Sequence, residues 1–348
     1  MRDFSYVPII KTTDSEIKGY SNLSSDVKNE ILPVFELTRS RPVKAFPTGD
    51  VHKRMEQLRE YTEGNPFILD LTSHEDLANE QIEALSDDTN GFQEWRNFLR
   101  LYNDINIIPM IHLYPDDLDT CVEFLEISKG QYNFFAFRIS VETTTEECEK
   151  YLEVINSVID ISKKLIFIID CDYVDERNFS ERLKQAGDIL VLAEDKSIYK
   201  VSVNSSSFPS SVRDRLGAED SEGCFEMLEV KFYNAVKSEC LFDICYGDYA
   251  GIHPIRRTIA GGNWVPRVDF VRPYEYLYKR FRREDGGYKR AASEVVLWSE
   301  FNPAYTCWGI DQIREAANSE PPGKSPSFWI TVRLNIHITF ISSVSTLS

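Results

Sequence analysis

LIFIIDCD (residues 165–172) is a short apolar run that ends on acidic residues, and seven similar runs occur along the chain. Each run has the length of a buried strand, and segments with helical spacing lie between the runs. Strand and helix that alternate eight times predict a parallel sheet whose two faces are both covered. The other seven runs are YVPIIK (6–11), ILPVFELT (31–38), PFILDLTS (66–73), IIPMIHLY (107–114), FFAFRIS (134–140), IYKVSVN (198–204) and LFDICYGD (241–248).

The length of this alternating region favours a closed barrel. Eight rounds in about 250 residues match the usual size of a (β/α)8 barrel. An open doubly wound sheet is the rival, and it would normally carry a glycine-rich turn after its first strand. Here that turn reads KTTDSEIKG (11–19), which has no glycine cluster. The sequence therefore predicts an α/β fold with a TIM-like (β/α)8 barrel over residues 1–252.

Residues 253–348 exceed what a simple barrel requires. RPYEYLYKRF (272–281) and GGYKRAASEVVLW (286–298) are read as two short helices, and FWITVRLNIHITFI (328–341) alternates like a terminal strand. We expect a C-terminal extension packed on the barrel. A small second domain is the alternative.

Composition narrows the class of protein. The chain has 348 residues, a net charge of −17 and seven cysteines with no CxxC pair. Its apolar runs are far shorter than the roughly 18 residues that a membrane helix needs. The N-terminus lacks the layout of a secretory signal. These features predict an acidic cytoplasmic protein with free thiols and no membrane partner.

Positive charge is concentrated in residues 253–290, a segment of net charge +6 that is rich in aromatic residues. Arginine interleaved with aromatic residues suits phosphate contact and base stacking. Arg256 and Arg257 are the candidate phosphate contacts within it. Alternatively, these cations complement the acidic barrel and pack their stems on the aromatic rings.

Polar residues end most of the eight runs. Side chains alternate across a strand, so the apolar residue two positions earlier shares a face with each polar one. If that face is the barrel interior, the polar groups converge at the carboxyl ends of the strands, where active sites of this fold lie. The candidate catalytic residues are Glu36, Asp70, His112 and Asp170, and the candidate binding residues are Lys11, Arg138, Asp172 and Asp248.

Three interpretations of this ring remain open. The carboxylates and His112 could ligate a divalent metal such as magnesium or manganese, which would activate water. Lys11 and Arg138 could instead hold an anionic substrate while His112 or a carboxylate moves protons. Finally, the ring could be a structural network with Lys11 paired to Glu36 and Arg138 to Asp170. The sequence contains no GxSxG elbow, P-loop, HExxH or GxGxxG motif that would name another chemistry.

Several longer motifs resemble the phage T4-type beta protein family of bacteria and phages. They are YVPIIKTTDSEIKGYSNL (6–23), ILPVFELT (31–38), FDICYGDYAG (242–251), PRVDFVRPYEYLYKRF (266–281) and FWITVRLNIHITFI (328–341). The residues on family-like positions are Lys11, Glu36, Asp248, Trp329 and His337. The chain departs from the pattern after its first strand, which is more polar and acidic, and around Asn335. The resemblance implies a setting in phage–host conflict and specifies no reaction.

Three functions follow as expectations. The first is a barrel enzyme, such as a hydrolase, that acts on an anionic, phosphate-bearing substrate such as a nucleotide or nucleic acid. The second is a non-catalytic protein that binds a protein partner in defence or anti-defence. The third is nucleic-acid binding through residues 253–290.

Overall fold

The computed structural model describes most of the chain. The described residues are 3–211, 221–255, 264–272, 274–302 and 306–344. Arg256 and Arg257 lie outside them.

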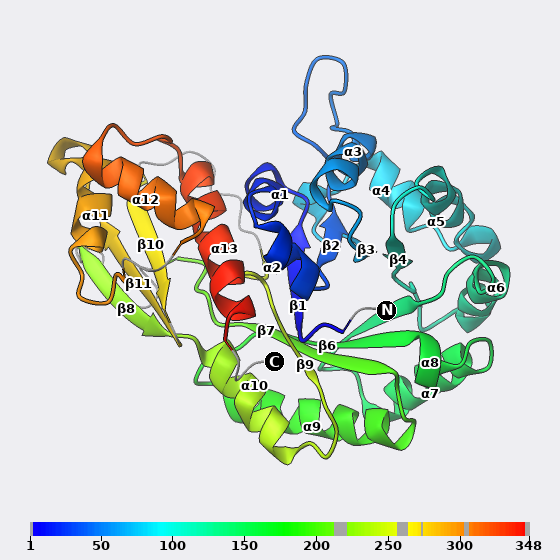
Figure 1. The fold of residues 1–348 in the computed structure, drawn as a ribbon. Coiled ribbons are helices and arrows are strands. Elements are labelled where there is room, and N and C mark those ends of the chain that lie inside the picture. Colours follow the sequence, from blue (N-terminus) through cyan, green and yellow to red (C-terminus); the bar gives the residue numbers. More distant parts are fainter. Residues whose placement is uncertain (1–2, 212–220, 256–263, 273, 303–305, 345–348) are drawn as a thin grey trace.

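All eight predicted runs form strands of one parallel sheet (Figure 1). The strand order is β4-β3-β2-β1-β9-β7-β6-β5. The strands are β1 (Tyr6–Lys11), β2 (Val34–Leu37), β3 (Phe67–Leu71), β4 (Ile107–Pro109), β5 (Phe135–Ser140), β6 (Leu165–Tyr173), β7 (Lys200–Ser206) and β9 (Cys245–Asp248).

The sheet is nearly closed into a barrel. Its two edge strands, β4 and β5, meet through an isolated parallel bridge between Met110 and Ala136. There the Ile111 N–H donates to the Ala136 carbonyl at 2.7 Å. The edges therefore lie next to each other, and all strand carboxyl ends face the same rim.

The alternation of side chains separates two apolar cores. The inner core fills the space enclosed by the strands and includes Val7, Val34, Ile68, Ile108 and Ile168. The larger outer core lies between the strands and the surrounding helices. Burial on both faces explains why the strands read as nearly continuous apolar runs.

Helices alternate with the strands and cover the outside of the sheet (Figure 1). They are α1 (Asp14–Ser21), α2 (Ser25–Glu30), α3 (Val51–Tyr61), α4 (Glu80–Leu85), α5 (Thr89–Leu101), α6 (Leu118–Ser128), α7 (Thr145–Asn156), α8 (Ile161–Lys164), α9 (Phe179–Asp195) and α10 (Leu228–Glu239). Single 3-10 turns lie at Glu75–Leu77 and Arg283–Asp285. None of the helices in the described ranges is long and apolar enough to cross a membrane.

A second sheet lies beside the barrel, with strand order β10-β11-β8. It is antiparallel and consists of β8 (Glu222–Glu226), β10 (Arg267–Arg272) and β11 (Glu275–Arg280). The helices α11 (Gly287–Val296), α12 (Trp308–Asn318) and α13 (Pro326–Ser342) accompany it. Since β8 precedes the last barrel strand, the extension includes residues from before position 253.

Two sequence predictions in this region were wrong. The segment 272–281 was predicted as a helix, yet it contains β11, because its tyrosines recur at every second position. The terminal strand predicted over 328–341 is helix α13. Ser325 caps this helix and Pro326 occupies its first turn.

Candidate functional site

Arg138 lies at the centre of the polar strand ends. Its Nε and Nη2 both donate to Asp170 Oδ2, at 2.9 and 2.6 Å. Its Nη1 donates to Glu36 Oε1 at 2.7 Å and to Asp70 Oδ2 at 3.1 Å. Its Nη2 also donates to the Tyr249 hydroxyl at 3.0 Å. Five strand ends therefore meet at one guanidinium, and we call these five residues with Lys11 the rim cluster.

These contacts engage every donor that Arg138 has. A guanidinium carries five N–H groups, and the five hydrogen bonds account for all of them. Tyr249 completes the pattern by contacting both oxygens of Asp170, at 2.8 and 2.7 Å. In this arrangement a ligand reaches the guanidinium only by displacing one of its present partners.

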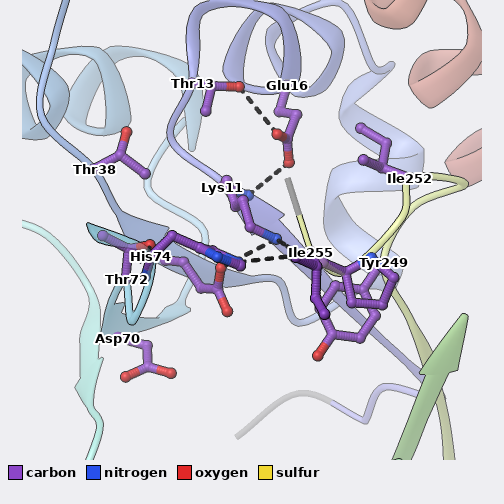
Figure 2. A network of polar contacts seen from close by, with 12 residues as sticks. Lys11, Thr13, Glu16, Thr38, Asp70, Thr72, His74, Tyr249, Ile252 and Ile255 are labelled. Atoms are coloured by element: carbon purple, nitrogen blue, oxygen red, sulfur yellow. Dashed lines mark hydrogen bonds and ion pairs between the residues drawn. The ribbon is translucent and has the colours of Figure 1, made fainter. Parts of the chain in front are cut away.

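Lys11 is the second cation of the rim cluster (Figure 2). Its Nζ lies 3.4 Å from Glu36 Oε2 and donates to the Pro254 carbonyl at 2.9 Å. The same carbonyl lies 3.1 Å from His74 Nε2. The Lys11 ammonium also lies 5.2 Å from the centroid of the Tyr249 ring. The pairs Lys11–Glu36 and Arg138–Asp170, which the structural-network interpretation named, are both present.

Two carboxyl groups of the rim cluster have pKa values shifted in opposite directions. Burial raises the pKa of Glu36, but Lys11 and Arg138 outweigh it and hold the pKa at about 2. Burial dominates at Asp70, and despite the attraction of Arg138 its pKa rises to about 6. Glu36 is therefore a permanent anion at neutral pH, whereas Asp70 can gain or lose a proton near pH 6.

Asp172 lies next to the rim cluster and has an unusual backbone. Its φ is 53°, in the left-handed region, and the register of β6 against β7 shifts between Asp170 and Tyr173. Its N–H donates to Asp170 Oδ1 at 3.0 Å. Its side chain is partly buried, and burial together with Asp170 raises its pKa. Bulges of this kind redirect a side chain, often beside active sites.

His112 does not reach the rim cluster. The last residue of β4 is Pro109, and past the Met110 bridge the chain no longer alternates as a strand. The His112 ring packs against Phe92 and Trp95 of α5, with centroids 6.0 and 5.4 Å apart. Burial lowers its pKa to about 4. This histidine belongs to the helix layer and is neutral at physiological pH.

Asp248 lies on the opposite face of its strand, towards the extension. Its Oδ2 is 2.6 Å from His337 Nε2 of α13, and its Oδ1 accepts from the Tyr6 hydroxyl at 2.7 Å. His337 Nδ1 in turn lies 3.1 Å from the Tyr276 hydroxyl, which donates to Glu229 Oε1 at 2.9 Å. We call this buried set the inter-layer network; its further members are Ser207, bonded to Glu229, and Tyr246, bonded to Asp248.

The residues present do not suit the divalent metal that the sequence allowed. Within the described ranges, no group of three or more His, Cys, Asp or Glu side chains is arranged to hold a metal ion. The reason is visible in the geometry, because His112 lies elsewhere and the Arg138 guanidinium takes the position between the carboxylates. We therefore derive no step through a metal.

Sequence reasoning missed Tyr249 and His74. The alternation rule that placed Asp70 and Arg138 would have found Tyr249, because Cys245 and Tyr249 both belong to the inner core. The same rule assigns Asp248 to the outer face. His74 follows β3 in a loop, and no strand periodicity predicts where a loop side chain points.

The fold and the rim cluster define a class of α/β proteins with a nearly closed parallel barrel and charged residues at the carboxyl ends of its strands. The family model described as Beta protein matches residues 6–343, so the chain belongs to the Beta protein family. It is 28% identical to Protein beta of Enterobacteria phage P4, over 97% of this chain and 92% of that protein. A solved structure, the spore cortex-lytic enzyme SleL of Bacillus megaterium QM B1551, matches 96% of this chain and 75% of its own, at 9% identity and a TM-score of 0.34.

Proposed function

We propose that this protein is a cytoplasmic TIM-like barrel enzyme that hydrolyses a phosphate ester at the rim cluster. The observation that carries the proposal is that two carboxyl groups with oppositely shifted pKa values share one guanidinium at the strand ends. Carboxyl groups whose pKa values are driven apart by their surroundings commonly divide acid–base roles between them. The seven free cysteines suit a reducing compartment.

Asp70 is the proton carrier in this proposal. Its Oδ2 makes the longest of the five hydrogen bonds of Arg138, at 3.1 Å. When Asp70 is protonated it loses its negative charge, and its bond to Nη1 weakens. A phosphate oxygen can then take its place on the guanidinium, where Lys11 adds a second positive charge. Glu36 and Asp170 remain ionised and hold Arg138 in position.

The chemical step then balances as an ester hydrolysis. Water attacks phosphorus, the bond to the ester oxygen breaks, and the Asp70 carboxylic acid donates its proton to the leaving oxygen. The attacking water releases a proton, which returns to the Asp70 carboxylate. Proton transfer by one positioned side chain typically contributes about 10²–10⁴-fold to the rate.

The pH dependence of phosphate-diester binding tests this mechanism. Dimethyl phosphate is a diester whose one acidic group stays ionised near neutral pH, so a pH effect on its affinity reports the protein. Calorimetry should show that binding takes up a proton and weakens about tenfold per unit above pH 6. Asp70→Asn should bind with an affinity that does not depend on pH. Asp87→Asn, an exposed control, should behave like the wild type.

Turnover tests the enzyme directly. We expect the wild type and Asp87→Asn to release nitrophenolate from bis(p-nitrophenyl) phosphate, and Asp70→Asn to release it about 10²–10⁴-fold more slowly while keeping a folded circular dichroism spectrum. A wild type that neither binds dimethyl phosphate nor hydrolyses this ester overturns the proposal.

A second candidate is a non-catalytic interaction protein. The engagement of all five Arg138 donors by the protein itself favours it, since a saturated guanidinium suits a structural network. The phage-encoded relative would set such a protein in phage–host conflict. This candidate would be supported if the wild type neither binds dimethyl phosphate nor hydrolyses the ester, and if a substitution in the rim cluster unfolds the protein.

A further inference from the structure

A short hairpin projects from the molecule between β2 and α3. We call residues 41–48 the finger, and all eight of them are exposed. Val43 and Phe46 close it through two backbone hydrogen bonds of 3.0 and 2.9 Å. At its base, the Asp50 N–H donates to Ser40 Oγ at 3.0 Å and the Ser40 N–H donates to the Asp50 carbonyl at 3.2 Å. The finger is thus held firmly at its neck while its tip stands in solvent (Figure 1).

The tip of the finger is both apolar and basic. Val43 is 49% exposed and Phe46 is 50% exposed, and between them lies Lys44. Arg41 precedes them, and the finger contains no acidic residue. An exposed phenyl ring beside two cations is typical of a surface that binds an acidic partner. The chain itself is such a partner, because its net charge is −17.

A hollow between α9 and α10, which we call the groove, is apolar like the finger but acidic where the finger is basic. Its volume is about 270 Å³. A dry apolar cavity of about 150 Å³ holds benzene, so this volume accepts a phenyl ring. Its apolar lining includes Val191, which is 61% exposed, and Phe242. Its acidic lining consists of Asp188, Glu194 and Glu239, against one lysine, Lys184.

The finger and the groove lie at opposite ends of the molecule in Figure 1, with the finger at the top and α9 and α10 at the bottom. A finger therefore cannot enter the groove of its own chain. We propose that the groove binds the finger of a second copy of this chain, with the Phe46 ring in the hollow and Arg41 and Lys44 facing its carboxylates. The charges are complementary, and the apolar groups of both sides leave water together.

Such a contact is head-to-tail, because different surfaces of the two copies meet. Each copy keeps a free groove or a free finger, so association continues into a chain or closes into a ring. One buried ring and a few exposed ion pairs suit a weak contact, with a dissociation constant of about 10 µM to 1 mM. The ion pairs are exposed, so added salt weakens the association.

Sedimentation velocity on the full chain tests the proposal. The wild type should form dimers and longer species as its concentration rises to about 1 mM. Phe46→Ser removes the ring, and Val191→Lys places a cation where the finger is basic; each variant should be monomeric. Both positions are exposed, so we expect melting temperatures close to that of the wild type. Lys324→Glu, which changes an exposed charge elsewhere, should associate like the wild type.

A mixture of Phe46→Ser and Val191→Lys provides the most specific test. Phe46→Ser keeps a working groove and Val191→Lys keeps a working finger, so together they should form a 1:1 dimer that cannot extend. A wild type that stays monomeric, or a mixture that stays monomeric, overturns the proposal. Association that survives either single substitution also overturns it, because another surface would then be responsible.

Discussion

The Arg138 guanidinium joins side chains from four other strands or strand ends through five hydrogen bonds. Lysine carries a comparable charge but has three N–H donors that radiate from a single atom. It can balance part of the charge of the three carboxylates, yet it cannot reach all of them at once. The shape of the guanidinium, more than its charge, therefore holds the rim cluster together.

Arg138→Lys should consequently destabilise the protein by about 3–5 kcal/mol, because it leaves buried carboxylates without a partner. Urea denaturation at neutral pH measures this cost. Arg177→Lys is the matched control, since Arg177 pairs with Asp175 while its own side chain is 89% exposed. The control should change stability by less than about 0.5 kcal/mol. Equal effects of the two substitutions would contradict the role of Arg138.

Asp70 gives the stability of the protein a dependence on pH. Its pKa rises from 3.8 to about 6 on folding. Below pH 4 it is protonated in both states; between pH 4 and pH 6 the unfolded chain releases the proton while the folded chain keeps it. Stability is therefore lost as pH rises through this window, by about 3 kcal/mol.

Asp70→Asn removes this loss. The free energy of unfolding of the wild type relative to Asp70→Asn should fall by about 2–3 kcal/mol between pH 4 and pH 7. Glu36 has the opposite dependence at lower pH, but it is present in both proteins and cancels in the comparison. Denaturant titrations at the two pH values provide the measurement. If the difference in free energy of unfolding between the two proteins is the same at both pH values, the pKa of Asp70 is not raised by folding.

At the residue scale, the alternation of side chains predicted Glu36, Asp70, Arg138 and Asp170 together. It failed at His112 because β4 ends at Pro109, so the rule was applied beyond the strand. It was not applied to the last strand, where it would have selected Tyr249 in place of Asp248. The pKa difference between Glu36 and Asp70 depends on distances to Lys11 and Arg138 that no sequence pattern contains.

At the scale of elements, the sequence of α13 explains why this helix was predicted as a strand. Apolar residues alternate with Thr331, Arg333, Asn335 and His337, and all four of these polar residues are buried. A helix covered on every side has no polar face, so the helical period disappears from its sequence. Each of these four residues has a specific partner; Arg333 Nη1, for example, donates to Asp269 Oδ2 at 2.8 Å.

The close packing of α12 on α13 depends on a glycine. A Cβ on Gly309 would lie 2.6 Å from Ile336 Cγ1 and 2.7 Å from the Val332 carbonyl. The carbonyl belongs to the helix backbone and cannot move aside. Gly309→Ala should therefore cost about 1–3 kcal/mol.

Gly187 in α9 is the control, because a Cβ there meets nothing within 4 Å. Gly187→Ala should stabilise the protein by about 0.5–1 kcal/mol, since alanine favours a helix. Thermal denaturation of the two variants should thus shift the melting temperature in opposite directions. A stabilising Gly309→Ala would show that the two helices are farther apart than described.

At the scale of the whole molecule, the barrel and the extension share the inter-layer network. Asp248 and Tyr6 belong to the barrel, while Tyr276 and His337 belong to the extension. His337→Leu leaves the Asp248 carboxylate buried without this partner, which should cost about 3–5 kcal/mol. Because the contact joins both parts, the loss should lower the stability of both.

Tryptophan fluorescence can follow the two parts separately. Trp95 is in the barrel, and the other four tryptophans are at position 264 and beyond. A Trp95→Phe background therefore reports on the extension, and far-ultraviolet circular dichroism reports on the whole chain. We expect both signals to give one urea midpoint, and His337→Leu to shift both equally. Two separate midpoints would contradict a shared unfolding unit.

The alternating pattern of the sequence predicted the eight strands and their parallel arrangement, because each strand is buried on both faces. It did not predict the second sheet. β8 and β11 are far apart in the chain, and their pairing depends on a tertiary contact between residues 222–226 and 275–279. The extension therefore begins inside the segment that the sequence assigned to the barrel.

The central claim is that burial within the rim cluster raises the pKa of Asp70 to about 6, against the attraction of Arg138. Carbon-13 NMR of the carboxyl groups, with Asp70→Asn to assign the signal, measures this directly. We predict that the Asp70 carboxyl titrates with a pKa near 6. A pKa close to the ordinary aspartate value of about 4 would contradict the claim.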